Sequence, residues 1–132
     1  MPHARHIHNL GHMETQNAID SFAALSQQTR LDAFRLLIRH EPTGLAAGEI
    51  ARRLAVPHNT MSAHLAVLAR AGLIASQRRS RSIIYRANLA EMGELIGFLV
   101  SDCCAGHPEV CDRLTLPMGA CGPTKQRRGD NS

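Results

Sequence analysis

The sequence predicts a mainly α-helical domain that carries one β-hairpin, an α+β fold. Apolar residues recur every three or four positions through most of the chain, which is the period of amphipathic helices. Between about residues 73 and 86 two short runs that contain isoleucine flank a polar turn and predict the hairpin. Aromatic residues make up only 3% and Trp is absent, so aliphatic side chains must build the core, which suits helices packed on helices.

The 132 residues are expected to form one domain with short tails. We expect a mobile, histidine-rich tail over residues 1–13, the folded domain over residues 14–104, and a ligand-binding loop with a second mobile tail over residues 105–132. A metal-binding role for the N-terminal histidines is the alternative. No run of apolar residues is long enough to cross a membrane, and no signal peptide is found. The four cysteines then predict reduced thiols in the cytoplasm.

Two helices are predicted first. The first covers about residues 14–28, with Ile19 and Phe22 on its apolar face together with Ala23 and Ser26. The second is expected to begin behind Thr29 as its N-cap and to run to about residue 40, where the stretch 41–44 breaks it.

A helix-turn-helix pattern follows. A short helix over about residues 46–54 and a longer one over 58–71 are joined by the three residues 55–57. The longer helix carries an apolar stripe of Met61, Leu65 and Leu68, and Gly72 is placed to end it in a left-handed conformation. The hairpin strands, residues 73–77 and 82–86, flank a connection with three arginines in four residues. A last helix, capped by Asn88, has its apolar face from Met92 to Cys103. This order of elements is the winged helix-turn-helix layout.

The chain carries a net charge of +4 and a pI near 9.3, which favours an anionic partner such as nucleic acid. Short polar side chains at the start of the second helix of the motif can reach base edges and phosphates in a major groove. The hairpin arginines can follow the phosphates or enter the minor groove. The predicted DNA-binding residues are His58, Asn59, Thr60, Ser62, Ala63, His64, Arg78, Arg79 and Arg81. Alternatively, the arginines form a solvated turn and His64 forms a hydrogen bond within the fold.

The run Ser62-x-His64-Leu65-x-x-Leu68-x-x-x-Gly72-Leu73 resembles the recognition helix of the ArsR/SmtB family of metal-responsive repressors. Residues 25–31, Leu-Ser-Gln-Gln-Thr-Arg-Leu, resemble that family's opening, and the resemblance covers about residues 15–104. It implies a homodimer that pairs through its first and last helices and binds double-stranded operator DNA.

The cysteines depart from the founding members of the family. Those carry a Cys-x-Cys pair on the first helix of the motif, and residues 45–50 here contain no cysteine. Zinc-sensing relatives place Asp and His ligands along the last helix, and residues 89–100 contain neither. A Cys-Cys pair at the end of the last helix with a third cysteine nearby instead resembles the arsenite-sensing branch with a C-terminal site. The predicted ligands of As(III) or Sb(III) are Cys103, Cys104 and Cys111, because soft ions select thiolates.

The expected function is therefore an arsenite- or antimonite-responsive repressor that leaves its operator when the inducer is bound. Several alternatives stay open. His107 with the three cysteines would suit zinc or cadmium, the thiols could form a redox switch, or the regulator could respond to no metal. Cys103 could also be a merely buried apolar residue. The spacing from Cys121 to Arg127 matches phosphatase and arsenate-reductase loops, but it lies five residues from the end with no room for the helix that loop needs, so no enzyme is expected.

Overall fold

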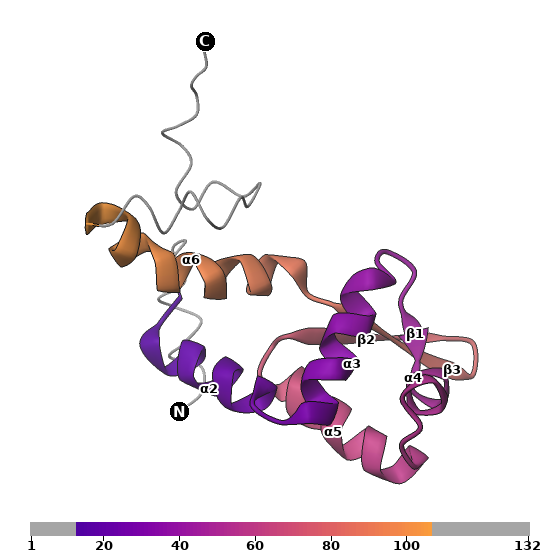
Figure 1. Ribbon diagram of the computed structural model, residues 1–132. Helices are drawn as coiled ribbons and strands as arrows, with labels where there is room; N and C mark the ends of the chain where they lie inside the picture. Colours follow the sequence, from indigo (N-terminus) through magenta and orange to yellow (C-terminus); the bar gives the residue numbers. More distant parts are fainter. Residues whose placement is uncertain (1–12, 107–132) are drawn as a thin grey trace. The chain divides into compact units, whose positions relative to one another are not determined.

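The computed structural model describes the backbone of residues 13–106 and the side chains of residues 13–100. Its elements (Figure 1) are α2 (Thr15–Leu25), α3 (Gln28–Arg39), β1 (Leu45–Ala46), α4 (Ala47–Leu54), α5 (His58–Arg70), β2 (Ile74–Arg79), β3 (Ser82–Ala87) and α6 (Leu89–Gly106). The described chain divides into two compact units, residues 15–91 and a unit that includes Met92–Gly106. The predicted winged helix-turn-helix is confirmed. No helix of the described residues is long and apolar enough to cross a membrane.

The core of the unit formed by residues 15–91 lies where α3, α4 and α5 meet. The apolar stripe of α5 is fully buried, as predicted, and so are Leu37 of α3 and Ile50 of α4. Each such side chain contributes roughly 1.5–3 kcal/mol by leaving water. Because residues three and four positions apart share one helix face, burying this stripe turns the polar side of α5 outward.

Backbone hydrogen bonds cap the C-terminal end of α5. The N–H groups of Gly72 and Leu73 donate to the carbonyl oxygens of Ala69 and Leu68, at 3.0 and 3.1 Å. Gly72 has φ +85°, so the predicted left-handed ending is confirmed. The next residue, Leu73, is buried and leads into the first strand of the hairpin. Ala55, with φ +57°, ends α4 in the same way and sets the turn of the helix-turn-helix motif.

The sheet has three antiparallel strands in the order β1-β3-β2. Arg79 lies opposite Ser82, so the hairpin turn consists of Ser80 and Arg81 alone, and Arg78 and Arg79 belong to β2. The third strand was not predicted: Leu45 in β1 pairs with Tyr85 in β3. Two residues are too few to show a strand pattern, and their partner lies far along the chain.

The predicted N-cap of α3 was wrong. Gln27, in extended conformation, is the N-cap, and its side-chain oxygen accepts a hydrogen bond from the Arg30 N–H at 2.9 Å. Thr29 lies inside the first turn, and Asp32 accepts instead from the Gln28 side chain at 3.1 Å. A glutamine is an unusual cap, so a rule based on Thr placed the start of the helix too late.

Within the chain, α2 buries a face other than the one that carries Ile19 and Phe22. Its buried residues are Ala18, Ser21 and Ala24, whereas Ile19 and Phe22 are 52% and 38% exposed in the single chain. Small side chains let α2 approach its neighbours closely, and the larger apolar residues are left on the outer side.

Asn88 forms the predicted cap of α6. Its side-chain oxygen accepts from the Glu91 N–H at 3.2 Å, and its amide group donates to the carbonyl of Gly72 at 3.1 Å. The cap thereby joins the start of α6 to the end of α5. The helical backbone of α6 includes Cys103 and Cys104.

Gly44 is predicted to tolerate no side chain. It has φ +78°, and an added Cβ would lie 2.5 Å from the Tyr85 carbonyl oxygen and 2.7 Å from Cγ of Arg86. We expect Gly44→Ala to lower the free energy of unfolding by more than about 2 kcal/mol, measured by urea denaturation. The control is Gly48→Ala, where the nearest atom is 3.7 Å away; it should be neutral or stabilise by up to about 1 kcal/mol. Equal stabilities of the two variants would contradict the close approach of Gly44 to β3.

Candidate nucleic-acid interface

The N-terminal end of α5 presents a polar surface. Five of the six residues predicted there are exposed: His58, Asn59, Thr60, Ser62 and Ala63. They face outward because Met61 and Leu65, between and behind them, are buried. The N-cap, Pro57, makes no side-chain hydrogen bond to the first turn. The first N–H groups of the helix can therefore face an anion such as phosphate.

The helix α4 lies beside this end of α5. A Cβ built on Gly48 would be 3.7 Å from Cδ2 and 3.9 Å from Nε2 of His58. The His58 ring thus lies against α4, at the point where the two helices of the motif come together. A methyl group at position 48 would make an ordinary van der Waals contact with this ring.

His64 differs from its neighbours because it has a partner within the fold. It is half-buried, and its Nδ1 lies 3.4 Å from Nη1 of Arg30. Since a guanidinium group only donates, Nδ1 is the acceptor of this hydrogen bond. Arg30 also donates from Nε to the Ala24 carbonyl at 2.6 Å. Arg30 therefore links the end of α2 to the middle of α5, a contact that the sequence did not reveal.

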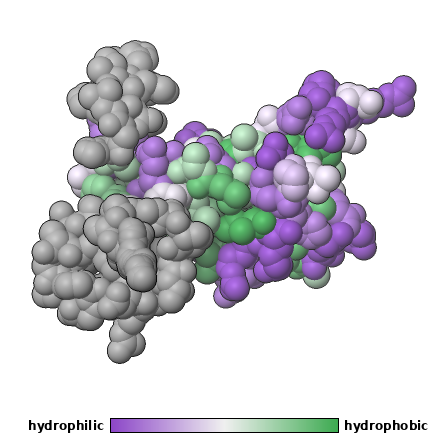
Figure 2. Space-filling model, turned by 90° about the horizontal axis from the view of Figure 1, so that it is seen from above, coloured by the Kyte–Doolittle hydropathy of each residue, from purple (hydrophilic) through white to green (hydrophobic). Residues whose placement is uncertain are grey.

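The wing, which is the hairpin formed by β2 and β3, carries positive charge on both of its faces. Arg78 on β2 lies opposite Ile83 and Arg79 opposite Ser82, and consecutive strand residues point to opposite faces. Arg81 lies in the turn itself. All three arginines are exposed, and Figure 2 shows the wing as a narrow, mostly hydrophilic arm. This distribution suits a groove that has phosphates on both sides better than a flat contact.

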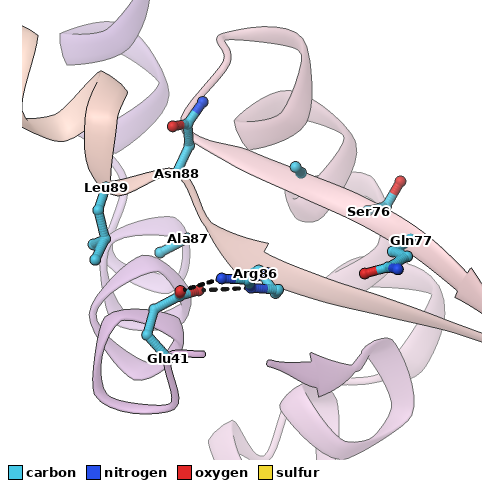
Figure 3. A pocket seen from close by; sticks show the side chains of 8 residues that line it. Glu41, Ser76, Gln77, Arg86, Ala87, Asn88 and Leu89 are labelled. Carbon is cyan, nitrogen blue, oxygen red and sulfur yellow. Dashed lines mark hydrogen bonds and ion pairs between the residues drawn. The ribbon is translucent and has the colours of Figure 1, made fainter. Parts of the chain in front are cut away.

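The base of the wing is held by an ion pair. Nη2 of Arg86 lies 2.7 Å from Oε1 of Glu41, so the ion pair joins the start of the loop after α3 to β3. The Arg86 guanidinium holds the pKa of Glu41 below its usual range. Beside the pair is a hollow of about 610 Å³ (Figure 3), lined by Glu41, Ala75, Ser76, Gln77, Arg86, Ala87, Asn88 and Leu89. The two charges are 45 positions apart in the sequence, so no local pattern predicts them.

A second ionic cluster lies on the exposed side of α4. Glu49 is paired with Arg52, and its Oε2 lies 2.8 Å from Nε of Arg53. Hydrogen bonds from these two arginines lower the pKa of Glu49 to about 2. Arg53 also lies 3.1 Å from Nε2 of His40. The spacing of three and four residues along a helix is typical of such pairs.

The predicted thiolate site lies outside the residues whose side chains the structure describes. Cys103 and Cys104 lie on the helical backbone of α6, and Cys111 falls beyond the described range, as do His107 and Cys121. Among the described residues, no group of three or more His, Cys, Asp or Glu side chains could hold a metal ion. The metalloid ligands therefore stay a prediction.

Removal of Arg30 should disturb both the stability of the fold and His64. We expect Arg30→Ala to lower the free energy of unfolding by about 1 to 3 kcal/mol, because the Ala24 carbonyl loses a charged donor. The ¹⁵N signals of the His64 ring should shift as Nδ1 loses its partner. The control is Arg35→Ala, an exposed site on the same helix, which should change stability by less than about 0.5 kcal/mol. If the two variants match and the His64 signals stay unchanged, Arg30 does not link these helices.

Comparison with known proteins agrees with this geometry. Residues 25–77 match the model of a family described as a helix-turn-helix domain. The transcriptional activator HlyU of Vibrio cholerae is 29% identical over 93 residues, which cover 69% of this chain and 83% of HlyU.

Two solved structures have a similar fold. An ArsR-like transcriptional regulator from Rhodococcus sp. RHA1 is 27% identical with a TM-score of 0.62, covering 78% of this chain and 96% of that one. The homodimeric winged helix-turn-helix DNA-binding domain of Mb0332 from Mycobacterium bovis is 23% identical with a TM-score of 0.53, covering 74% and 84%. The chain therefore contains a helix-turn-helix domain and has the winged fold of ArsR-like transcriptional regulators.

Proposed function

We propose that this chain is a cytoplasmic, homodimeric repressor that binds operator DNA and releases it when arsenite or antimonite is bound by Cys103, Cys104 and Cys111. The observation that carries the DNA-binding part is the exposed polar end of α5, with an arginine-bearing wing in the same compact unit. In a helix-turn-helix protein this end enters the major groove. The relatives, which are named as transcriptional regulators, support this proposal.

The contacts divide into two kinds. Thr60, Ser62 and Asn59 are short and polar, and they can hydrogen-bond to base edges or phosphates. The wing arginines contact phosphates, which orient the protein without reading the sequence. His64 takes part through the ring that Arg30 holds in place.

A two-fold dimer is supported by the exposed apolar residues of α2. Ile19 and Phe22 expose large apolar side chains in the single chain, and a second copy would remove them from water. The homodimeric state named for the Mycobacterium bovis domain agrees with this arrangement. Two recognition helices about 34 Å apart can then read successive turns of the major groove.

The thiolate site is supported by the chemistry of its donors. Trivalent arsenic is soft, and it is bound by three thiolates. Cys103 and Cys104 are adjacent on α6, and on an ideal helix they would point about 100° apart. Both must therefore be brought to one ion by a change at the end of the helix, with Cys111 as the third donor. Because α6 is also the proposed dimer helix, binding there changes the spacing of the recognition helices, and the operator is released.

The test is fluorescence anisotropy of a labelled duplex that contains the promoter of the chain's own gene. The protein should bind the duplex, and arsenite or antimonite should release it. Cys103→Ser and Cys104→Ser should bind equally well and should not be released, because only two thiolates remain. Cys121→Ser is the matched control and should respond like the unaltered chain. Release of either Cys103→Ser or Cys104→Ser by arsenite would contradict the site.

The same titration separates the alternatives. Release by zinc or cadmium, but not by arsenite, would indicate the four-ligand site with His107. Release by an oxidant alone would indicate a thiol switch, and binding that no addition changes would indicate a constitutive regulator. Since HlyU is named as an activator, transcription from the bound promoter in vitro decides the sign of regulation: repression supports the proposal, and activation overturns that part of it.

A further inference from the structure

We infer that Glu49 determines specificity by occupying the two arginines of α4, so that they do not bind the phosphates of random DNA. This inference rests on the proposed DNA binding and adds to it a residue that opposes unspecific binding. It concerns the first helix of the helix-turn-helix motif, which in such motifs crosses the DNA backbone.

Arg52 lies on the same side of α4 as Gly48. Gly48 of α4 lies against His58, at the end of α5 proposed to enter the groove. Arg52 is four residues after Gly48, so it lies on the same side of α4. Ile50, on the opposite side of α4, is buried. Arg52 is thus placed on the side of the motif that would face DNA.

Glu49 is paired with both arginines of α4. Glu49 accepts from Nε of Arg52 at 3.3 Å and from Nε of Arg53 at 2.8 Å, and its Oε2 also accepts from Nη2 of Arg52. The arginine side chains are 71% and 40% exposed, and that of Glu49 is 29% exposed. One carboxylate therefore holds two exposed cations, of which Arg53 also lies 3.1 Å from Nε2 of His40. With its pKa near 2, Glu49 stays charged at any pH at which the protein would bind DNA.

This pairing changes the positive charge that α4 presents to DNA. Exposed ion pairs add little to stability, so the main effect of Glu49 is on the charge that DNA meets. Binding to random sequence depends on phosphate contacts, whereas specificity depends on base contacts. An acid that removes two phosphate contacts therefore removes a larger share of the free energy of binding to random sequence than of binding to an operator, which is also held by base contacts.

The experiment compares full-length variants on a labelled random-sequence duplex over a range of salt concentrations. Glu49→Gln keeps the size of the side chain and removes its charge. We expect tighter binding at every salt concentration, with a slope of log K against log salt steeper by about 0.9 to 1.8, the value for one or two added phosphate contacts. Glu49→Ala should give the same change, which excludes an effect of the amide.

Two controls make the result specific. Asp32→Asn removes one negative charge from α3, where Asp32 accepts from Gln28 and not from an arginine; its slope should equal that of the unaltered chain. The triple variant Glu49→Gln, Arg52→Ala, Arg53→Ala should lose the added slope. Thermal unfolding of each variant checks that the fold is kept.

The outcomes are distinct. If Glu49→Gln and Asp32→Asn behave alike, or if Glu49→Gln binds random DNA more weakly, the inference about Glu49 is wrong while the proposed function stands. If the unaltered chain binds no duplex at all, neither operator nor random, the proposed function fails and this inference fails with it.

Discussion

The burial of the apolar stripe of α5 is the interaction on which the rest of the structure depends. Met61, Leu65 and Leu68 are fully buried together with Leu37 of α3 and Ile50 of α4. Because these positions share one face of α5, their burial turns the polar residues His58, Asn59, Thr60 and Ser62 outward. The left-handed turns at Ala55 and Gly72 then set the turn before α5 and the path into the wing after it. The core thereby decides which side chains can reach DNA.

Periodic and local signals were sufficient to predict most of this fold. The stripe of α5, the ending at Gly72 and the Asn88 cap each depend on neighbours within a few residues, and each is confirmed. The two-residue strand β1 has no pattern of its own and forms only because Tyr85 and Ile84 are present as partners. On α2 the face buried within the chain is made of small residues with a weak hydrophobic signal, so the sequence pattern shows only the face that carries Ile19 and Phe22. The contacts of Arg30 with His64 and of Glu41 with Arg86 join distant parts of the chain, and local patterns do not predict them.

The arginines of the wing and those of α4 differ in whether they can bind phosphate. Arg78, Arg79 and Arg81 extend on the wing, whereas Arg52 and Arg53 are occupied by Glu49. Positive charge is thus concentrated at the tip of the wing and reduced on α4, beside the end of α5. A protein that reads a short operator among many other sequences benefits from this division, because phosphate contacts alone attract it equally to all DNA. Control by a metalloid would act at the other end of the described chain, where α6 carries Cys103 and Cys104.

Sequence reading by the exposed end of α5, in a two-fold dimer, is tested by selecting tight binders from a pool of random duplexes and sequencing them. Enrichment of one two-fold symmetric sequence is expected, with half-site centres about 10 to 10.5 base pairs apart or a multiple of that distance. A pool that remains random after repeated selection, although the protein binds it, would contradict sequence reading by α5.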